Sequence, residues 1–302
     1  MKKCAAIFCV SLAFLLFRLN VFAWSAAGHQ VIAAEAYREL STDLKQKVTE
    51  LLKAHPDYAK WEKAFNDDSA KLDLPTFIFM RASVWPDEIR RHGNQYDHPH
   101  WHYIDYPLKP PSFPMEPAPS PTDDALYGIE QCQKCLADTK ASAQERAVYL
   151  SWLVHLIGDL HQPLHCASLF SAVYPAGDKG GNDFYVKPAT KGIKLHAFWD
   201  GLLGTSGKAH SLLNYAIQIQ AEHPRKSLEE LTKHKTPKQW SLEGRDLAIA
   251  KAYLRGDLKG TSNPDTAPPL PEGYTKAAKA VGEKQAALAG YRLADEISQY
   301  LK

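Results

Sequence analysis

Apolar residues recur at helical spacing along most of the chain, and few stretches alternate as a strand would. The best strand signal is a short run from Asp183 to Lys187. The pattern therefore predicts a mainly α protein with little strand. The helices are expected at residues 28–40, 44–54, 125–139, 143–164, 211–221, 239–255 and 273–301.

Two proline-rich stretches interrupt the helical pattern, at Pro107–Pro121 and Asn263–Pro271. Either has the composition of a domain linker. The candidate site residues described below lie on both sides of the first stretch. We therefore interpret both stretches as surface loops and residues 24–302 as a single domain.

The N-terminus has the pattern of a secretory signal peptide. Lys2 and Lys3 precede an apolar run over residues 5–17, and Val21-Phe22-Ala23 offers small residues for cleavage. The run is shorter than the ~20 residues that span a membrane. We expect cleavage after Ala23, a mature monomer beginning at Trp24 without a membrane anchor, and a periplasmic or secreted location.

The mature charge limits how the protein binds a polyanion. The signal segment contains three basic residues and no acid, so the mature chain has 36 − 3 = 33 basic and 34 acidic residues, a net charge of −1. A protein that binds nucleic acid mainly by counterion release is far more basic. If this chain binds a polyanion, something other than lysine must attract it.

Three cysteines remain after cleavage: Cys132, Cys135 and Cys166. The Cys132-x-x-Cys135 spacing resembles half of a zinc ribbon, but the chain has no second such pair. An exported compartment permits disulfides. We therefore predict one disulfide among the three thiols, with the pairing left open.

One segment places ionisable side chains in an apolar helix. Residues 147–164 have almost no polar face, yet they contain His155 and Asp159, which lie one helical turn apart. Burial of an ionised carboxylate costs several kcal/mol unless it is paired or coordinated. A structural His–Asp hydrogen bond and a metal site both satisfy this condition.

Similar residues in apolar surroundings favour the metal site. His165 follows Pro163, and His196 and Asp200 form a second pair at the same spacing. The others are His29, Asp87, His102 and Asp105. Each alone is more often an ordinary core residue, but so many together indicate cations. Nitrogen and oxygen ligands in an oxidising compartment are typical of zinc.

The order of these motifs resembles a known family. The chain carries W-x4-H, W-x-D-E-x-R, W-H-x-x-D, H-x-x-x-D-x5-H, G-G-N and H-x-x-x-D, from Trp24 to Asp200. This order is similar to that of the zinc-dependent single-strand-specific nucleases of fungi, plants and bacteria, also called type I nucleases or 3′-nucleotidases. Their helical fold is shared with bacterial zinc phospholipase C.

The resemblance implies a ligand set for three zinc ions. The first ion would be held by Asp87, His102, His155 and Asp159, and the second by His165, His196 and Asp200. The third would be held by His29 together with the α-amino nitrogen and carbonyl oxygen of Trp24, with Asp159 bridging the first and third ions. That amino group exists only after cleavage behind Ala23.

The resemblance also implies catalytic and substrate-binding roles. Asp105 would deprotonate the nucleophile, and Arg90 would hold a phosphate oxygen. Tyr103 stands where fungal relatives carry phenylalanine and would stack on a base. Asn182, in Gly180-Gly181-Asn182, would contact the substrate or support the site. A surface arginine and a plain turn are the simpler interpretations of Arg90 and Asn182.

The implied activity is hydrolysis of single-stranded DNA and RNA to 5′-phosphorylated products, with 3′-nucleotidase activity. The alternatives are a phospholipase C-like enzyme, whose relatives carry glutamate in place of Asp200, and a zinc-binding protein without turnover. The remaining histidines are not assigned to metal. His161 is expected to point away from the metal face, and the rest to lie in polar or solvated positions: His55, His92, His98, His100, His210, His223 and His234.

Overall fold

The computed structural model describes residues 24–68, 72–90, 93–110 and 120–301. The predicted signal peptide and part of the first proline-rich stretch lie outside these residues. None of the helices in the described part is long and apolar enough to cross a membrane.

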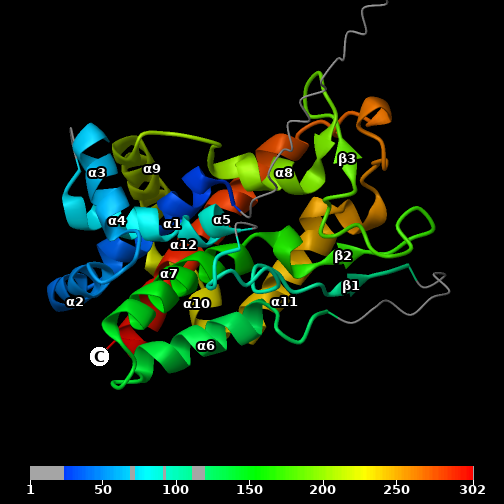
Figure 1. Cartoon of the computed structure of the whole chain (residues 1–302). Coiled ribbons are helices and arrows are strands. Elements are labelled where there is room, and N and C mark those ends of the chain that lie inside the picture. The colour runs from blue at the N-terminus through cyan, green and yellow to red at the C-terminus, as the bar shows by residue number, and fades with distance from the viewer. Residues whose placement is uncertain (1–23, 69–71, 91–92, 111–119, 302) are drawn as a thin grey trace, which may run out of the picture.

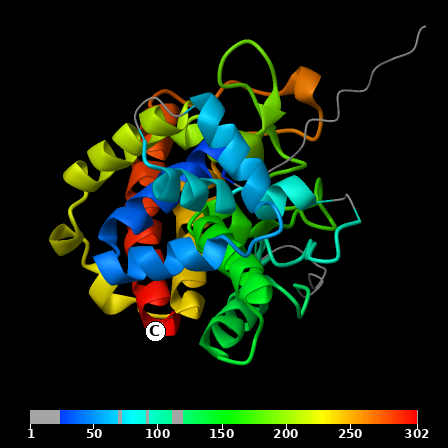
Figure 2. The same ribbon diagram turned by 60° about the vertical axis from the view of Figure 1, so that its left-hand side comes forward.

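Helices dominate the fold, as the sequence pattern predicts (Figure 1). The long α12 (Tyr274–Tyr300) packs against α1 (Ala26–Glu39) and α7 (Ala143–Leu160), and it runs through the middle of the helices in both views (Figure 2). The other helices that the sequence predicts are α2 (Thr42–Leu52), α6 (Ala125–Ala137), α9 (Ala209–Glu222) and α11 (Pro237–Leu247).

Strand content is small. β1 (Pro107–Leu108) pairs in parallel with β2 (Ser168–Leu169), and β3 (Tyr185–Val186) pairs antiparallel with β4 (Ile193–Lys194). The predicted strand at 183–187 is thus reduced to two residues. In Figure 1 the short strands and long loops lie at one side of the molecule, and most helices lie at the other.

Two predicted helices end earlier than the apolar pattern does. The side chain of Ser142 caps α7, which stops at Leu160, and Pro163 then begins a 3₁₀ turn, η1 (Pro163–Cys166). Proline has no N–H to donate and disfavours a helical residue before it. The predicted helix over 239–255 ends as α11 at Leu247 and continues as a π turn over Ala248–Ala252.

The apolar pattern of the sequence did not predict several short helices. They are α3 (Tyr58–Asp68), α4 (Leu74–Ala82), α5 (Trp85–Ile89), α8 (Leu195–Asp200) and α10 (Glu230–Lys233). α4 is buried along most of its length and is apolar on nearly all sides, so it shows no helical period. The charge-rich run 225–238 contains α10 and the start of α11.

The predicted disulfide is not present. Cys132, Cys135 and Cys166 are free thiols. Cys132 and Cys135 lie within one turn of α6, while the buried thiol of Cys166 donates to the carbonyl of Leu160. Burial raises the pKa of Cys166, so this thiol stays protonated at neutral pH.

Candidate metal centre

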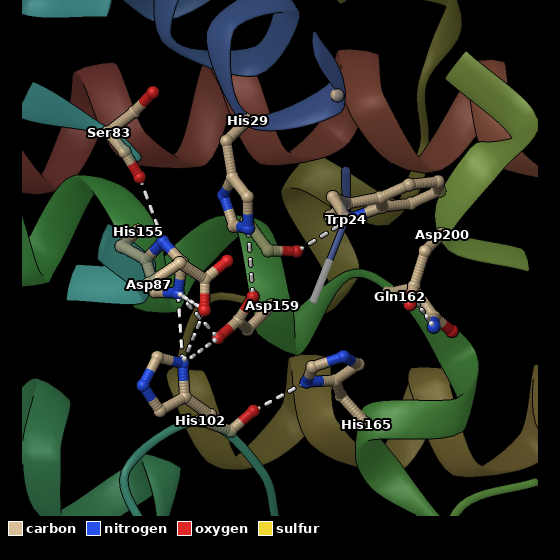
Figure 3. A network of polar contacts seen from close by, with 12 residues as sticks. Trp24, His29, Ser83, Asp87, His102, His155, Asp159, Gln162, His165 and Asp200 are labelled. Atoms are coloured by element: carbon tan, nitrogen blue, oxygen red, sulfur yellow. Dashed lines mark hydrogen bonds and ion pairs between the residues drawn. The ribbon is translucent and has the colours of Figure 1, made fainter. Parts of the chain in front are cut away.

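The helix α7 supplies the middle of the site. His155 and Asp159 are fully buried, and His155 Nε2 lies 3.1 Å from Asp159 Oδ2. The N–H at His155 Nδ1 donates to the carbonyl of Ser83 at 2.8 Å, so Nε2 carries the lone pair when the ring is neutral. Figure 3 shows both side chains pointing toward His102 and Asp87.

His102 and Asp87 complete the first group. His102 Nδ1 lies 2.9 Å from His155 Nε2 and 3.1 Å from Asp159 Oδ2. Asp87 Oδ1 lies 3.8 Å from each of the two ring nitrogens. Asp87 Oδ1 and His102 Nε2 have no hydrogen-bond partner among the described residues. More acceptor atoms converge here than protons can satisfy, which is the arrangement that a cation stabilises.

A second group lies past the end of α7. His165 Nδ1 donates to the carbonyl of His102, and His196 Nδ1 donates to the carbonyl of Gly180 at 2.7 Å. The two Nε2 atoms therefore both present lone pairs, yet they lie only 3.1 Å apart. Asp200 Oδ2 lies 3.6 Å from His196 Nε2. Facing lone pairs repel each other, so the donor set fits a bound metal ion.

The third group joins the start of the described chain to α7. His29 Nε2 lies 3.2 Å from Asp159 Oδ1, and its ring stacks on that of His155 with centroids 4.0 Å apart. Trp24 is fully buried, and its Nε1 donates to the carbonyl of Gly158 at 2.9 Å. Trp24 and His29 thus lie beside Asp159, which also contacts the first group (Figure 3).

Burial sets the charges of these side chains before any cation binds. It lowers the pKa of His29 to about 4 and that of His196 to about 3, so both rings are neutral and able to ligate at pH 7. Burial raises the pKa of Asp87 to about 6 and that of Asp200 well above its usual value. Burial also opposes ionisation of Asp159, but His155 and its neighbours hold the pKa of Asp159 well below its usual value.

Of the two residues with predicted catalytic roles, Arg90 contacts the first group, and Asp105 follows Ile104, whose N–H donates to the carbonyl of His165. Arg90 ends α5, with Nη1 3.6 Å from Asp87 Oδ1. The backbone N–H of Asp105 donates to Ser120 Oγ at 3.2 Å. Burial, followed by the charge of Asp178, raises the pKa of Asp105 to about 6. Asp105 is therefore mostly ionised at neutral pH and able to accept a proton.

The predicted substrate residues lie close by. Tyr103 is half-buried, and its ring meets that of His100 edge-on at 6.4 Å. Asn182 Nδ2 donates to the carbonyl of Lys179 at 2.9 Å, which leaves its Oδ1 without a hydrogen-bond partner among the described residues. Gly180 has a φ of +62°, and an added Cβ would lie 2.3 Å from the carbonyl oxygen of Leu164. The G-G-N turn therefore positions the carbonyl that orients His196.

Sequence reasoning missed Gln162. This buried side chain donates from Nε2 to Asp200 Oδ1 at 2.7 Å and accepts the N–H of Leu164 at its Oε1. It holds the Asp200 carboxylate of the second group in place. A polar residue inside an otherwise apolar segment between His161 and His165 was the available signal.

The environment of two other histidines was predicted from the sequence, correctly for one and wrongly for the other. His161 points away from the metal groups, as predicted, because its Nε2 accepts from Arg292 at 2.8 Å. His55 was predicted to be solvated, and this is wrong. It is 3% exposed, its ring stacks on Trp61, and burial lowers its pKa to about 3.

The fold and the site together define the class. This is a mainly helical protein in which described histidines and aspartates form three buried groups able to hold metal ions: His29–Asp87–His155, His102–His155–Asp159 and His165–His196–Asp200. His155 belongs both to the set with His29 and Asp87 and to the set with His102 and Asp159, and His165 donates to the carbonyl of His102, so the three sets form one connected centre rather than separate sites.

Comparison with known proteins places the chain more closely. The model of the S1/P1 nuclease family matches residues 24–302, so the chain belongs to that family of metal-dependent nucleases. Endonuclease 2 of Arabidopsis thaliana is 25% identical over 320 residues, covering 93% of this chain and 91% of the relative. Endonuclease 4 of the same plant is 26% identical over 260 residues, covering 72% and 76%. Nuclease P1 of Penicillium citrinum is 26% identical over 180 residues, covering 59% and 57%.

Proposed function

We propose that the chain is an exported zinc-dependent endonuclease that hydrolyses single-stranded DNA and RNA to 5′-phosphorylated products and also acts on 3′-nucleotides. The observation that carries this proposal is the convergence of buried histidines and aspartates around Asp159, with neutral ring nitrogens facing each other. The family match and the plant and fungal relatives support the nuclease activity.

The proposed ligands are the residues of these groups. Asp87, His102, His155 and Asp159 would hold one zinc ion, and His165, His196 and Asp200 a second. His29 and the backbone of Trp24 would hold a third beside Asp159. Bound zinc would supply positive charge for the phosphate oxygens and lower the pKa of nearby water.

Four side chains near the proposed metal ligands would activate the water and bind the substrate. Asp105 would accept the proton of the attacking water, since its carboxylate is ionised at neutral pH. Arg90 would donate hydrogen bonds to a phosphate oxygen. Tyr103 would offer a stacking face to an unpaired base, which favours single strands over duplexes. Asn182 would contact the substrate through its unpartnered oxygen.

An activity panel tests the proposal. Purified protein beginning at Trp24 is assayed on single-stranded DNA, duplex DNA, RNA, a 3′-nucleotide and phosphatidylcholine, with zinc measured by mass spectrometry. We expect cleavage of the single strands and loss of it on chelation, with recovery when zinc is restored. Lipid hydrolysis without nuclease activity would show instead that the enzyme is a phospholipase C-like relative. Zinc binding without any turnover would show a binding protein.

Gln162 provides a sharper test of the second metal group. Gln162→Met keeps the side-chain volume but removes the hydrogen bond to Asp200. Removal of such an orienting hydrogen bond typically weakens metal affinity by about 10–100-fold. A chelator competition titration should show one zinc ion released at correspondingly lower chelator concentration. Gln220→Met is the matched control, because Gln220 is a buried glutamine bonded to the carbonyl of Glu35, away from the centre. Equal zinc affinity in both variants would contradict the assignment of Asp200.

A further inference from the structure

Tyr106, the residue after Asp105, forms a cluster with two basic residues of α11. Lys238 Nζ, from the first turn of α11, donates to Tyr106 Oη at 2.6 Å and lies 4.8 Å from the centroid of the ring. The guanidinium carbon of Arg245, two turns further along α11, lies 5.8 Å from the same centroid. The ring of Tyr106 therefore contacts two cationic side chains.

Hydrogen bonds fix the geometry of this cluster. Ser241 Oγ donates to the carbonyl of Lys238 at 2.8 Å, so the hydroxyl of Tyr106, 3.0 Å away, donates to Ser241. Tyr106 then accepts from the Lys238 ammonium, which closes a ring of three residues. Such a ring orients the lysine before any ligand arrives, which reduces the entropy cost of binding.

The positive charge of the cluster is only partly compensated. Lys238 forms no ion pair with a carboxylate in the part of the chain that the structure describes, and Arg245 pairs only with its neighbour Asp246 among these residues, at 2.8 Å. Both side chains of that pair are exposed. An exposed pair of this kind contributes little and exchanges readily for another anion.

Backbone contacts tie the cluster to the metal centre. The N–H of Ile104 donates to the carbonyl of His165 at 2.8 Å, and the N–H of Ser168 donates to the carbonyl of Tyr106 at 3.0 Å. The helix α11 packs against η1, which carries His165. In Figure 1, α11 lies beside β1 and β2, which continue these two segments. The cluster therefore keeps a fixed position relative to Asp105.

We propose that Lys238 and Arg245, oriented by Tyr106, form a subsite for a backbone phosphate of the single-stranded nucleic acid, outside the scissile phosphate. This proposal rests on the proposed nuclease function. The subsite would add a local contact with the polyanion to the attraction that bound zinc would supply, without a large positive net charge on the chain. A local pair of oriented cations binds phosphate where the overall charge does not. The subsite contacts phosphate and not bases, so it gives no base preference.

Substrate length provides the test. The double variant Lys238→Ala/Arg245→Ala is compared with the wild type on a long single-stranded oligonucleotide and on a 3′-nucleotide, which has no second phosphate to occupy the subsite. We expect the ratio of kcat/KM for the oligonucleotide to that for the 3′-nucleotide to fall at least about tenfold, because the loss of a single charged hydrogen bond has about this effect and the double variant removes two cations. The salt dependence of the oligonucleotide KM should also weaken, by about 0.7 in the logarithmic slope for each phosphate that is no longer neutralised.

A matched control separates this role from a general decrease in surface charge. Lys279, on α12, lies over the ring of Tyr215 at 5.7 Å in the same kind of contact. Lys279→Ala should leave the ratio and the salt slope unchanged. An unchanged ratio in the double variant would overturn the subsite, and so would an equal fall in the control. If the wild type hydrolyses no single-stranded nucleic acid at all, the proposed function fails first.

Discussion

Replacement of Asp105 by asparagine is expected to lower kcat on single-stranded DNA by about 10²–10⁴-fold, the usual loss when a general base is removed. The change keeps the size of the side chain but removes its ability to accept a proton. Asp105 is not a proposed metal ligand, so the zinc content measured by mass spectrometry should stay at the wild-type value. Burial and the charge of Asp178 raise the pKa of Asp105 only to about 6, so the native carboxylate is ready to act at neutral pH.

The control for this prediction is another acid near the site. Asp123 is exposed and pairs with His100 at 3.0 Å, next to Tyr103 in space. Asp123→Asn removes the same charge from the same region, and we expect it to change kcat by less than about twofold, since surface pairs of this kind contribute little. Retained activity in Asp105→Asn would refute the role of the base. Loss of zinc in that variant would show that Asp105 holds the centre together instead.

The sequence predicted the long helices because their buried faces follow the helical period. α1, α6, α9 and α12 begin and end within about three residues of the predicted bounds, close to the usual error at helix ends. The same period failed for α4, which is buried on nearly all sides, and for α8, which has only six residues. In those segments burial and tertiary contacts determine the conformation, and neither produces a helical period of apolar residues in the sequence.

Many residues of the candidate site could also be predicted from the sequence, but from burial of ionisable side chains rather than from the helical period. An acid or a histidine in an apolar segment demands a partner, so His155, Asp159, His196 and Asp200 could be singled out before their neighbours were known. The sequence could not show which groups meet, because the contacts join distant segments. The sequence could not show that Ser83 orients His155, because it does so through its backbone carbonyl. Every residue has a backbone carbonyl, so the residue type gives no signal.

His55 shows the limit of judging burial from neighbours in sequence. Lys53 and Asp57 lie two residues before and after it in the sequence, and these charged neighbours suggested a solvent-exposed position. In the fold, Trp61 stacks on its ring at 4.4 Å and Trp85 meets it edge-on at 4.6 Å. Both tryptophans belong to helices that the period did not predict, so the error at His55 follows from the missing α3 and α5.

A chain that keeps one residue ahead of Trp24 is expected to bind one zinc ion fewer and to lack most of its activity. An α-amino group has a pKa of about 7.7–8.0 and deprotonates readily beside a cation, whereas a peptide nitrogen offers no such lone pair. In the structure, Trp24 is fixed next to the centre, because its ring is buried and bonded to Gly158 and the N–H of Ser25 donates to the carbonyl of Asp200 at 3.1 Å. The position of the nitrogen is thus set by contacts that a longer chain would keep.

The measurement compares proteins beginning at Ala23 and at Trp24, with zinc per chain and kcat on single-stranded DNA as readouts. Trp24→Phe, also beginning at residue 24, is the control, because it keeps the free amine and removes only the hydrogen bond to Gly158. It should retain the third ion, with somewhat weaker affinity. If the chain beginning at Ala23 binds as much zinc and turns over as fast, the amine is not a ligand. In that case His29 and Asp159 would have to hold the ion without it. If the prediction holds and the proposed signal peptide is cleaved after Ala23, this cleavage completes the active centre, and we expect the uncleaved precursor to be inactive.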